Sequence, residues 1–424
     1  MLQPSAGDIE PLGRRIYVLA ILVVVYTFNF IDRQIVGILA VPIKTDLGLT
    51  DTQLGLMGGL AFALFYTALG IPIAMLADRA SRTWIMTIAL TVWSVMTAIC
   101  GLAQNFWQLF LARLGVGVGE AGGVAPAYSL ISDMFPPEQR ARALSVYSFG
   151  IPIGSALGIV LGGVIASRID WRTAFFAVGI AGVLLAPIFR LSVPEPARGR
   201  FDRGGPLNRA TLADVLGVIA GKPAFWALSL GAACSSMMGY GLFFWLPSFF
   251  VRSFEITLLQ ASLFYGSILL VGGLAGIWLG GVLADRFGAT QKSAYAVIPA
   301  IAFLTTVPFY VVGILSNSLA LSFAVLLVPT ALGLAWLGPV LSAIQHLVPS
   351  NMRATASAVF LFVNNLVGIG AGTVLIGLIS DALQVRFGAD SLRYSILVGT
   401  GFYLAAAALF LLASRRLERD WYRG

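Results

Sequence analysis

Long apolar runs follow one another along almost the whole chain, with short polar segments between them. A helix needs about 20 mainly apolar residues to cross a bilayer. Twelve segments meet this requirement, at 16–42, 52–76, 84–104, 107–130, 141–167, 171–193, 223–250, 260–284, 292–315, 319–346, 354–380 and 392–414. Because backbone polar groups inside a bilayer must bond within the protein, such runs predict helices. The sequence therefore predicts an all-α membrane protein with twelve transmembrane helices.

Composition excludes several other classes of protein. The chain is 58% hydrophobic and only 11% charged, whereas a soluble domain carries about 25% charged residues. The net charge is +8, but the basic residues lie in short loops between apolar runs, so we expect no nucleic-acid partner. Cys100 and Cys234 lie inside apolar runs, and we find no metal-ligand spacing, phosphate loop or nucleophile–base set. We therefore expect no enzyme activity, no metal and no cofactor.

The distribution of Lys and Arg predicts the orientation in the membrane. With the N-terminus in the cytoplasm, roughly three times as many Lys and Arg fall on the cytoplasmic side as on the outer side. Both termini are then cytoplasmic. The first apolar run begins at Ile16 and is too long for the core of a signal peptide, so we predict a retained helix.

The two halves of the chain repeat. MLADRASR (75–82) follows the second run and VLADRFGA (282–289) the eighth, while FPPEQRARA (135–143) precedes the fifth and VPSNMRATA (348–356) the eleventh. The two matches have nearly the same offset, which indicates a duplicated unit. We predict a six-helix bundle over 1–193, a cytoplasmic linker over 194–222 and a second six-helix bundle over 223–424. A parallel repeat of this kind places a substrate site near the membrane midplane.

Twelve runs, a long central loop and an LADR loop in each half resemble the major facilitator superfamily. The family's loop pattern has Gly four residues before the Asp, which the second copy keeps as Gly281 and the first replaces by Ala74. The resemblance implies a cytoplasmic gate formed by the loop charges and their partners, namely Asp78, Arg79, Arg140, Asp285, Arg286 and Arg353. The alternative is that these charges are merely solvated.

The run NFIDRQ (29–34) places two full charges inside the first apolar segment. A charge at the centre of a spanning helix costs about 2.5–3.5 kcal/mol, so such residues must face a cavity or a partner. Adjacent helical residues point about 100° apart, so Asp32 and Arg33 need different surroundings. Asn29, one turn earlier on their side of the helix, could hydrogen-bond to either, and we predict that it contributes to substrate binding. The alternative is an ion pair that only holds helices together.

A second charged constellation lies in FLARLGVGVGEAGGVAPAY (110–128). Arg113 and Glu120 are two turns apart on one helix face, about 10 Å along the axis, and Gly117 lies between them. The glycines make a thin helix that another can approach closely. Burial disfavours an ionised Glu120 and a nearby Arg favours it. We therefore hypothesise that movement of an Arg controls proton exchange at Glu120.

Together, NFIDRQ, RLGVGVGEAGG and FPPEQRARALSVYSFGIPIGSALG resemble the Spinster branch of the superfamily, over about the first 170 residues. Eukaryotic members of this branch export lysosomal lysophospholipids or sphingosine-1-phosphate. The resemblance implies that Asp32 and Glu120 are proton-coupling sites, and that Arg33 and Arg113 bind the polar head of a substrate or take part in coupling. It also implies a multi-pass protein of a bacterial inner membrane.

Three further features are less specific. Gly150, Gly154, Gly158 and Gly162 recur every four residues; this predicts close helix packing, and the alternative is an antiporter motif. The Met- and aromatic-rich SMMGYGLFFWLPSFF (236–250) predicts an apolar cavity wall or lipid-facing packing. Tyr240, Trp245, Asn364 and Asn365 are the polar groups expected to face substrate.

These features predict a monomeric, proton-coupled secondary active transporter of an amphipathic anionic lipid, either a lysophospholipid or a sphingosine-1-phosphate-like molecule. It would work by alternating access, with lipid, protons and the membrane as its partners. A proton-linked facilitator of small organic or sugar acids is the alternative within transport, because the same arginines suit a carboxylate. A lipid scramblase or a sensor is the alternative from another class.

Overall fold

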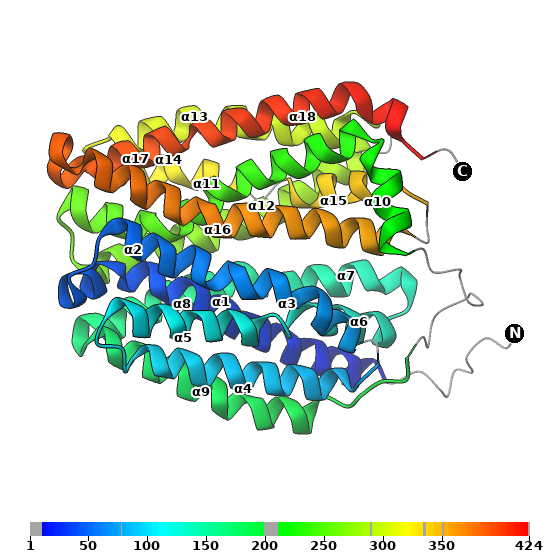
Figure 1. Ribbon diagram of the computed structural model, residues 1–424, viewed down its shortest axis with the longest axis horizontal. Helices are drawn as coiled ribbons and strands as arrows, with labels where there is room; N and C mark the ends of the chain where they lie inside the picture. The colour runs from blue at the N-terminus through cyan, green and yellow to red at the C-terminus, as the bar shows by residue number, and fades with distance from the viewer. Residues whose placement is uncertain are drawn as a thin grey trace, which may run out of the picture. The chain divides into compact units, whose positions relative to one another are not determined.

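The structure is a computed structural model that describes residues 11–77, 79–198, 211–288, 291–333, 336–349 and 352–422. Every regular element within these ranges is a helix (Figure 1), as predicted. The chain divides into two compact units, of which unit 1 comprises Met1–Leu47 and Ala61–Gly205. Unit 2 comprises Gly48–Leu60 and Pro206–Gly424.

Unit 1 is a bundle of eight described helices. They are α1 (Leu12–Leu47), α3 (Ala61–Ala77), α4 (Arg82–Cys100), α5 (Phe106–Glu120), α6 (Val124–Met134), α7 (Pro137–Ser148), α8 (Gly150–Arg168) and α9 (Trp171–Ser192). The side chain of Asn105 accepts from the Gln108 N–H at the start of α5, and Asp170 accepts from the Thr173 N–H at the start of α9. Such N-caps satisfy backbone donors that the helix leaves unpaired. α1 packs against α8 and α9, while α4 packs against α5 and α9.

The four-residue glycine repeat of α8 lies against α1. A β-carbon on Gly158 would lie 2.6 Å from the Ile31 carbonyl oxygen, and one on Gly162 would lie 2.9 Å from Ile35. Gly150 and Gly154 meet the preceding turns of α1 in the same way. The packing interpretation of this repeat is confirmed. Its consequence is that α8 fixes the backbone of α1 at Ile31, next to the Asp32–Arg33 pair.

Unit 2 contains α2 (Asp51–Gly55), the π-helix η1 (Leu56–Leu60), α10 (Leu212–Ala220), α11 (Pro223–Phe254), α12 (Leu258–Gly288), α13 (Ala294–Leu315), α14 (Leu319–Leu332), α15 (Leu337–His346), α16 (Arg353–Phe387), the 3₁₀-helix η3 (Gly388–Asp390), α17 (Ser391–Gly399) and α18 (Gly401–Asp420). α11 packs against both α16 and α18. The Thr373 hydroxyl of α16 donates to the Gly55 carbonyl at 2.9 Å. The small residues of α2 and η1 allow this approach, because a β-carbon on Gly55 would lie 2.5 Å from the Thr373 carbonyl oxygen.

One ion pair anchors α2 within unit 2. Arg252 donates through both terminal nitrogens to the Asp51 carboxylate, each at 2.7 Å. Asp51 is fully buried and also accepts from Ser380. On the other side, Asp381 accepts from the N–H groups of Asp51 and Thr52. The sequence analysis did not identify this cluster, because Asp51 precedes an apolar run and resembles an ordinary N-terminal helix charge.

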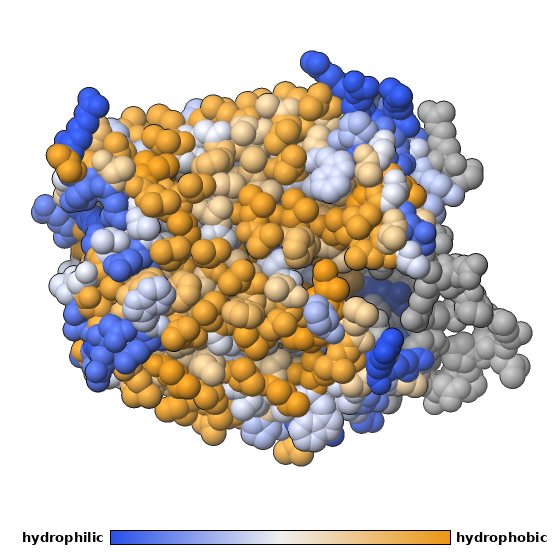
Figure 2. Space-filling view, in the orientation of Figure 1, coloured by the Kyte–Doolittle hydropathy of each residue, from blue (hydrophilic) through white to orange (hydrophobic). Residues whose placement is uncertain are grey.

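Ten helical stretches in the described part of the chain are long and apolar enough to cross a membrane. The predicted segment 107–130 is not among them, because turns at Ala121–Gly123 separate α5 from α6 and neither helix is long enough alone. The last stretch, Thr355–Asp420, has 66 residues and covers both of the last two predicted segments. Apolar residues cover the middle stretches of the helices, and hydrophilic residues gather near their ends (Figure 2). Such a surface suits a bilayer rather than water.

Candidate functional site

Four charged side chains of unit 1 form two ion pairs inside the bundle. Arg33 Nε lies 2.7 Å from Glu120 Oε2, and Arg113 Nη1 lies 3.2 Å from Asp32 Oδ1. Helix α1 supplies Asp32 and Arg33, and α5 supplies Arg113 and Glu120. The run NFIDRQ and the run RLGVGVGE therefore meet, and the two adjacent residues of α1 take different partners. Equal numbers of positive and negative charges allow the cluster to be buried.

The four side chains differ in how far they are exposed, and therefore in how easily a solute can reach them. The side chains of Glu120, Arg113 and Asp32 are 0%, 1% and 2% exposed, whereas that of Arg33 is 10% exposed. Arg33 is thus the member of this cluster that a solute can reach most easily. Its guanidinium carbon lies 4.7 Å from the ring centroids of both Phe62 and Tyr66. Aromatic faces attract a cation, so these rings help to hold Arg33 in place.

The shape of α5 allows its charges to reach α1. A β-carbon on Gly117 would lie 2.5 Å from the Phe62 carbonyl oxygen of α3, and one on Gly119 would lie 2.5 Å from the Trp93 nitrogen of α4. The glycines therefore let α5 pack directly against two backbones. Arg113 and Glu120 lie on either side of this contact, two turns apart, as the sequence spacing predicted.

Asp32 has a third partner that the sequence analysis missed. The Thr97 hydroxyl lies 2.7 Å from Asp32 Oδ2 and 2.9 Å from the Trp93 carbonyl oxygen. Thr97 belongs to α4 and is 1% exposed. A threonine in an apolar run has no distinguishing sequence signal. The sequence indicated only that Asp32 must face a cavity or a partner.

Asn29 makes no hydrogen bond to Asp32 or Arg33, and its role in substrate binding stays a prediction. Its side chain is buried, and within the described residues neither its Oδ1 nor its Nδ2 makes a hydrogen bond. The reason is that Asp32 turns toward α4 and α5, and Arg33 turns toward Glu120. Glu120 Oε1 is also buried and unbonded in this part of the chain. Both residues thus retain polar atoms that could serve a ligand or water.

The predicted polar residues of unit 2 have mixed surroundings. Trp245 is fully buried and donates to the Thr373 carbonyl at 2.9 Å. Asn364 accepts from the Ser236 hydroxyl at 2.8 Å and donates to Asn365 Oδ1 at 3.3 Å. Tyr240 is half-buried, with its ring centroid 6.4 Å from that of Phe243. The Trp245 and Asn364 side chains thus have partners inside the unit.

An apolar cavity of about 40 Å³ lies elsewhere in unit 2. Its wall includes Leu242, Phe243 and Leu246 from the Met- and aromatic-rich run of α11, together with Tyr265, Tyr310 and Tyr403. Three residues of the run thus line a small cavity. The prediction of a wide apolar cavity for an acyl chain stays a prediction.

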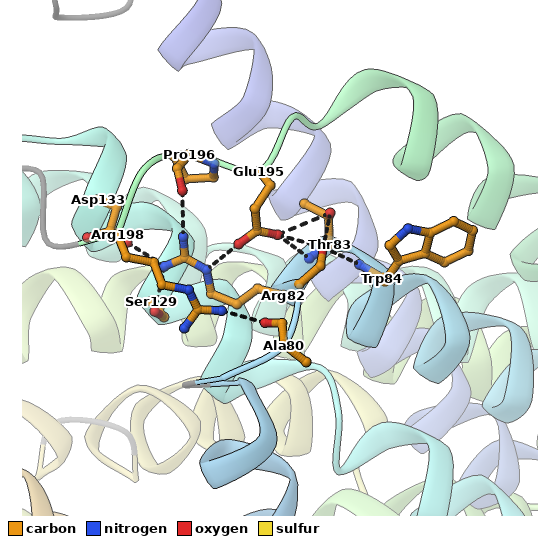
Figure 3. Close-up of polar contacts among 10 residues, drawn as sticks. Ala80, Arg82, Thr83, Trp84, Ser129, Asp133, Glu195, Pro196 and Arg198 are labelled. Atoms are coloured by element: carbon orange, nitrogen blue, oxygen red, sulfur yellow. Dashed lines mark hydrogen bonds and ion pairs between the residues drawn. The ribbon is translucent and has the colours of Figure 1, made fainter.

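A second charged cluster lies at the loop that joins α3 to α4, within unit 1 (Figure 3). Arg82 is 1% exposed and donates to Glu195 at 2.7 Å, to Ser129 at 2.8 Å and to the Pro196 carbonyl at 3.0 Å. It also forms an ion pair with Asp133. Partial burial opposes ionisation of Glu195, but hydrogen bonds from the Thr83 N–H, Arg82 and Ser81 outweigh it and lower the pKa of this carboxyl.

The residues predicted to form the gate are only partly described. Asp78 lies outside the described residues, and so do the side chains of Asp285 and Arg286. Arg79 and Arg353 are exposed, whereas Arg140 donates to the Ser132 carbonyl at 2.8 Å. Arg82, the last residue of MLADRASR, is the LADR-loop residue for which the structure describes the most extensive network.

The part of the chain that the structure describes contains no group of three or more His, Cys, Asp and Glu that could hold a metal. Cys100 and Cys234 are free thiols. His346 stacks on Trp421, with ring centroids 4.7 Å apart, and its Nδ1 lies 2.8 Å from the Ser342 carbonyl oxygen. These contacts give His346 a packing role near the end of α18.

The chain is similar to several known proteins. The sequence matches the Major Facilitator Superfamily over residues 22–372. An MFS-type efflux pump of Mycolicibacterium smegmatis is 34% identical, over 94% of this chain and 92% of the pump. Human protein spinster homolog 1 is 28% identical, over 98% of this chain and 86% of that protein. The crystal structure of a bacterial homolog of the human lysosomal transporter Spinster, inward-facing and unoccupied, matches with a TM-score of 0.89 and 32% identity, over 98% of this chain and 100% of that one.

Proposed function

Because the chain belongs to the Major Facilitator Superfamily and is a Spinster-like transporter rather than an enzyme, we propose that it couples protons to the transport of an amphipathic anionic lipid. The substrate would be a lysophospholipid or a sphingosine-1-phosphate-like molecule. Asp32 and Glu120 would exchange the protons, and Arg33 and Arg113 would meet the anionic head.

One observation carries the proposal: Arg33 is the most exposed member of a buried charge cluster, and its partner is Glu120. A phosphate or carboxylate that binds Arg33 must compete with the Glu120 carboxylate for the same guanidinium. Once displaced, Glu120 would be a buried carboxylate without its counter-charge, which favours its protonation.

Proton binding and anion binding then favour each other. A proton on Glu120 releases Arg33 for the anion, and an anion on Arg33 promotes proton uptake by Glu120. Linkage requires the two effects to be equal in size. Deprotonation of Glu120 would conversely expel the anion, which gives the proton gradient a means of driving release.

The predicted polar residues of unit 2 also belong to the proposal. Tyr240, Trp245, Asn364 and Asn365 are proposed to contribute to substrate binding during transport.

A proton-linked transporter of small organic or sugar acids is the second candidate. The observation that favours it is the Arg33–Glu120 pair itself, because it demonstrates that this guanidinium accommodates a carboxylate. The two candidates differ in whether an alkyl chain is required.

The remaining features of the proposal concern placement and gating. We place the protein in a bacterial inner membrane as a monomer, with both termini in the cytoplasm. Bundles over 1–193 and 223–424, joined by 194–222, would alternate access to the site. The cytoplasmic gate would comprise Asp78, Arg79, Arg140, Asp285, Arg286 and Arg353.

Transport into proteoliposomes tests the proposal. Purified protein is reconstituted, a pH gradient is imposed, and uptake of lysophosphatidic acid is compared with uptake of a panel of short organic acids. We expect gradient-dependent lysolipid uptake that a protonophore abolishes. Equal uptake with and without the gradient would remove proton coupling, and uptake of the organic acids alone would favour the second candidate.

A further inference from the structure

We propose that Thr97 is a positioning residue that completes the hydrogen bonding of Asp32 in both of its protonation states. The inference rests on the proposed function, because it concerns proton exchange at Asp32. It starts from a hydroxyl that faces two acceptors, Asp32 Oδ2 at 2.7 Å and the Trp93 carbonyl oxygen at 2.9 Å.

A threonine hydroxyl has one proton to donate and two lone pairs that accept. It can therefore donate to only one of the two oxygens at a time. When Asp32 is ionised, the hydroxyl donates to Oδ2. The Trp93 carbonyl then accepts only its helical hydrogen bond, from the backbone N–H four residues later. When Asp32 is protonated, its O–H donates to Thr97 Oγ, and the Thr97 hydroxyl rotates to donate to Trp93.

Each state is thus satisfied without water. This matters because Thr97 and Asp32 are each 1% exposed, and an unsatisfied buried polar group costs about 1–3 kcal/mol. The proton balance is simple: one O–H bond forms at Asp32 Oδ2, and the existing Thr97 O–H changes its acceptor. No other group needs to move.

The surroundings of Asp32 assign the proton to Oδ2. Arg113, from α5, lies 3.2 Å from the other oxygen, Oδ1, and favours an ionised oxygen there. The other charged or titratable groups that interact with Asp32 are Arg33 beside it on α1, Glu120 on α5 and Cys100 on α4. Thr97 is the neutral donor in this set, and it faces the oxygen that Arg113 leaves free.

The arrangement also links Asp32 to the helix that carries Glu120. Trp93, whose carbonyl can accept from the Thr97 hydroxyl, lies against Gly119. A β-carbon on Gly119 would lie 2.5 Å from the backbone nitrogen of Trp93. Protonation of Asp32 therefore adds a hydrogen bond to the Trp93 carbonyl, in the turn of α4 that contacts Gly119. Gly119 directly precedes Glu120. The two carboxylates are connected by this turn as well as by charge.

The matched variants are Thr97→Val, which keeps the shape and removes the hydroxyl, and Thr97→Ser, which keeps the hydroxyl. Thr87→Val is the control, because Thr87 is a buried threonine of the same helix whose hydroxyl donates to the Thr83 carbonyl at 2.7 Å. The full chain is reconstituted in nanodiscs. Infrared difference spectra then follow the carboxyl C=O band that Asp32→Asn removes, as a function of pH.

In Thr97→Val we expect this band to titrate about one pH unit higher than in the wild type, because the charged carboxylate loses more from a missing donor than the neutral acid does. Thr97→Ser should restore the wild-type titration, and Thr87→Val should leave it unchanged. Wild-type titration in Thr97→Val, or a Ser variant that behaves like Val, overturns the role of the hydroxyl. The spectra do not require transport. Equal uptake by proteoliposomes with and without the pH gradient would therefore refute the proposed function without bearing on the role of Thr97.

Discussion

Replacing Glu120 with Gln removes the carboxylate that, under the proposed function, competes with an anionic substrate for Arg33. The change keeps the size of the side chain and removes the Arg33–Glu120 ion pair, while the Phe62 and Tyr66 rings still contact Arg33. If anion binding requires displacement of Glu120, the variant should bind an anionic lipid more tightly than the wild type at neutral pH. It should also lose proton-driven uptake.

The size of the change in affinity follows from the Arg33–Glu120 contact, which the ligand no longer has to break. The Arg33–Glu120 contact is a charge-assisted hydrogen bond of 2.7 Å, and bonds to charged groups contribute about 1.5–3 kcal/mol. Since about 1.4 kcal/mol corresponds to tenfold, the affinity should rise by about 10- to 150-fold. The residual amide–guanidinium contact makes the lower end the safer expectation.

The assay is calorimetric binding of lysophosphatidic acid to the protein in nanodiscs at pH 6, 7 and 8. Monoacylglycerol, which lacks the phosphate, reports binding of the alkyl chain alone. In the wild type, the affinity for lysophosphatidic acid should rise as the pH falls, because protonation of Glu120 frees Arg33. In Glu120→Gln the affinity should be high, and the part of its pH dependence that comes from Glu120 should be lost.

Glu195→Gln is the matched control. Its carboxylate also lies 2.7 Å from an arginine Nε in unit 1, that of Arg82, but belongs to the other charged cluster (Figure 3). This variant should leave binding and its pH dependence unchanged. Unchanged or weaker binding by Glu120→Gln, or a pH dependence identical to that of the wild type, would refute the competition between Glu120 and substrate.

Three further outcomes concern stability and are measured by thermal unfolding in detergent. Gly158→Ala should destabilise by about 1–3 kcal/mol, because its β-carbon would lie 2.6 Å from a backbone oxygen, whereas Gly70→Ala, with nothing within 4 Å, should be neutral; equal effects would contradict the α1–α8 packing argument. Arg252→Gln should cost about 3–5 kcal/mol, because it removes the ion pair that Arg252 makes with the buried Asp51 carboxylate; a loss below about 1 kcal/mol would contradict this. Since the pKa of Glu195 is lowered in the folded state, its stabilisation should be present above the ordinary pKa of glutamate, about 4.3, and disappear as the pH falls through the lowered pKa; a Gln variant with an unaltered pH profile would contradict the assignment.

The sequence could predict that these buried charges need a partner or a cavity, because the bilayer leaves them few alternatives. Asp32, Arg33, Arg113 and Glu120 all lie inside apolar runs, and charges in such runs must pair or face a cavity. The choice of partners could not be predicted, because it depends on the rotation of α1 about its axis. That rotation is set by the glycine contacts of α8, whose register against α1 is a property of the folded bundle.

Thr97 and the Arg82–Glu195 pair were harder to predict for a different reason. Thr97 is one of several threonines in its run, and its importance arises only from the position of Asp32. Arg82 was evident as part of the LADR loop, but Glu195 lies in the polar linker, where nothing in the sequence distinguishes it from a solvated charge. Hydrogen-bond partners that are distant in sequence leave no periodic pattern.

The crossed pairing has a consequence that neither ion pair would have alone. Asp32 and Arg33 are adjacent, so a change of charge at one affects the other, and their partners lie two turns apart on one glycine-rich helix. Under the proposed function, an anion at Arg33 would alter the charge at Glu120, whereas a proton at Asp32 would weaken the attachment of Arg113 at the other end of the same helix face. The cluster would therefore respond to two protons and one anion as a unit. Its titration belongs to the set of four groups rather than to any one of them, so single substitutions should change the pH dependence of the remaining carboxylate as well.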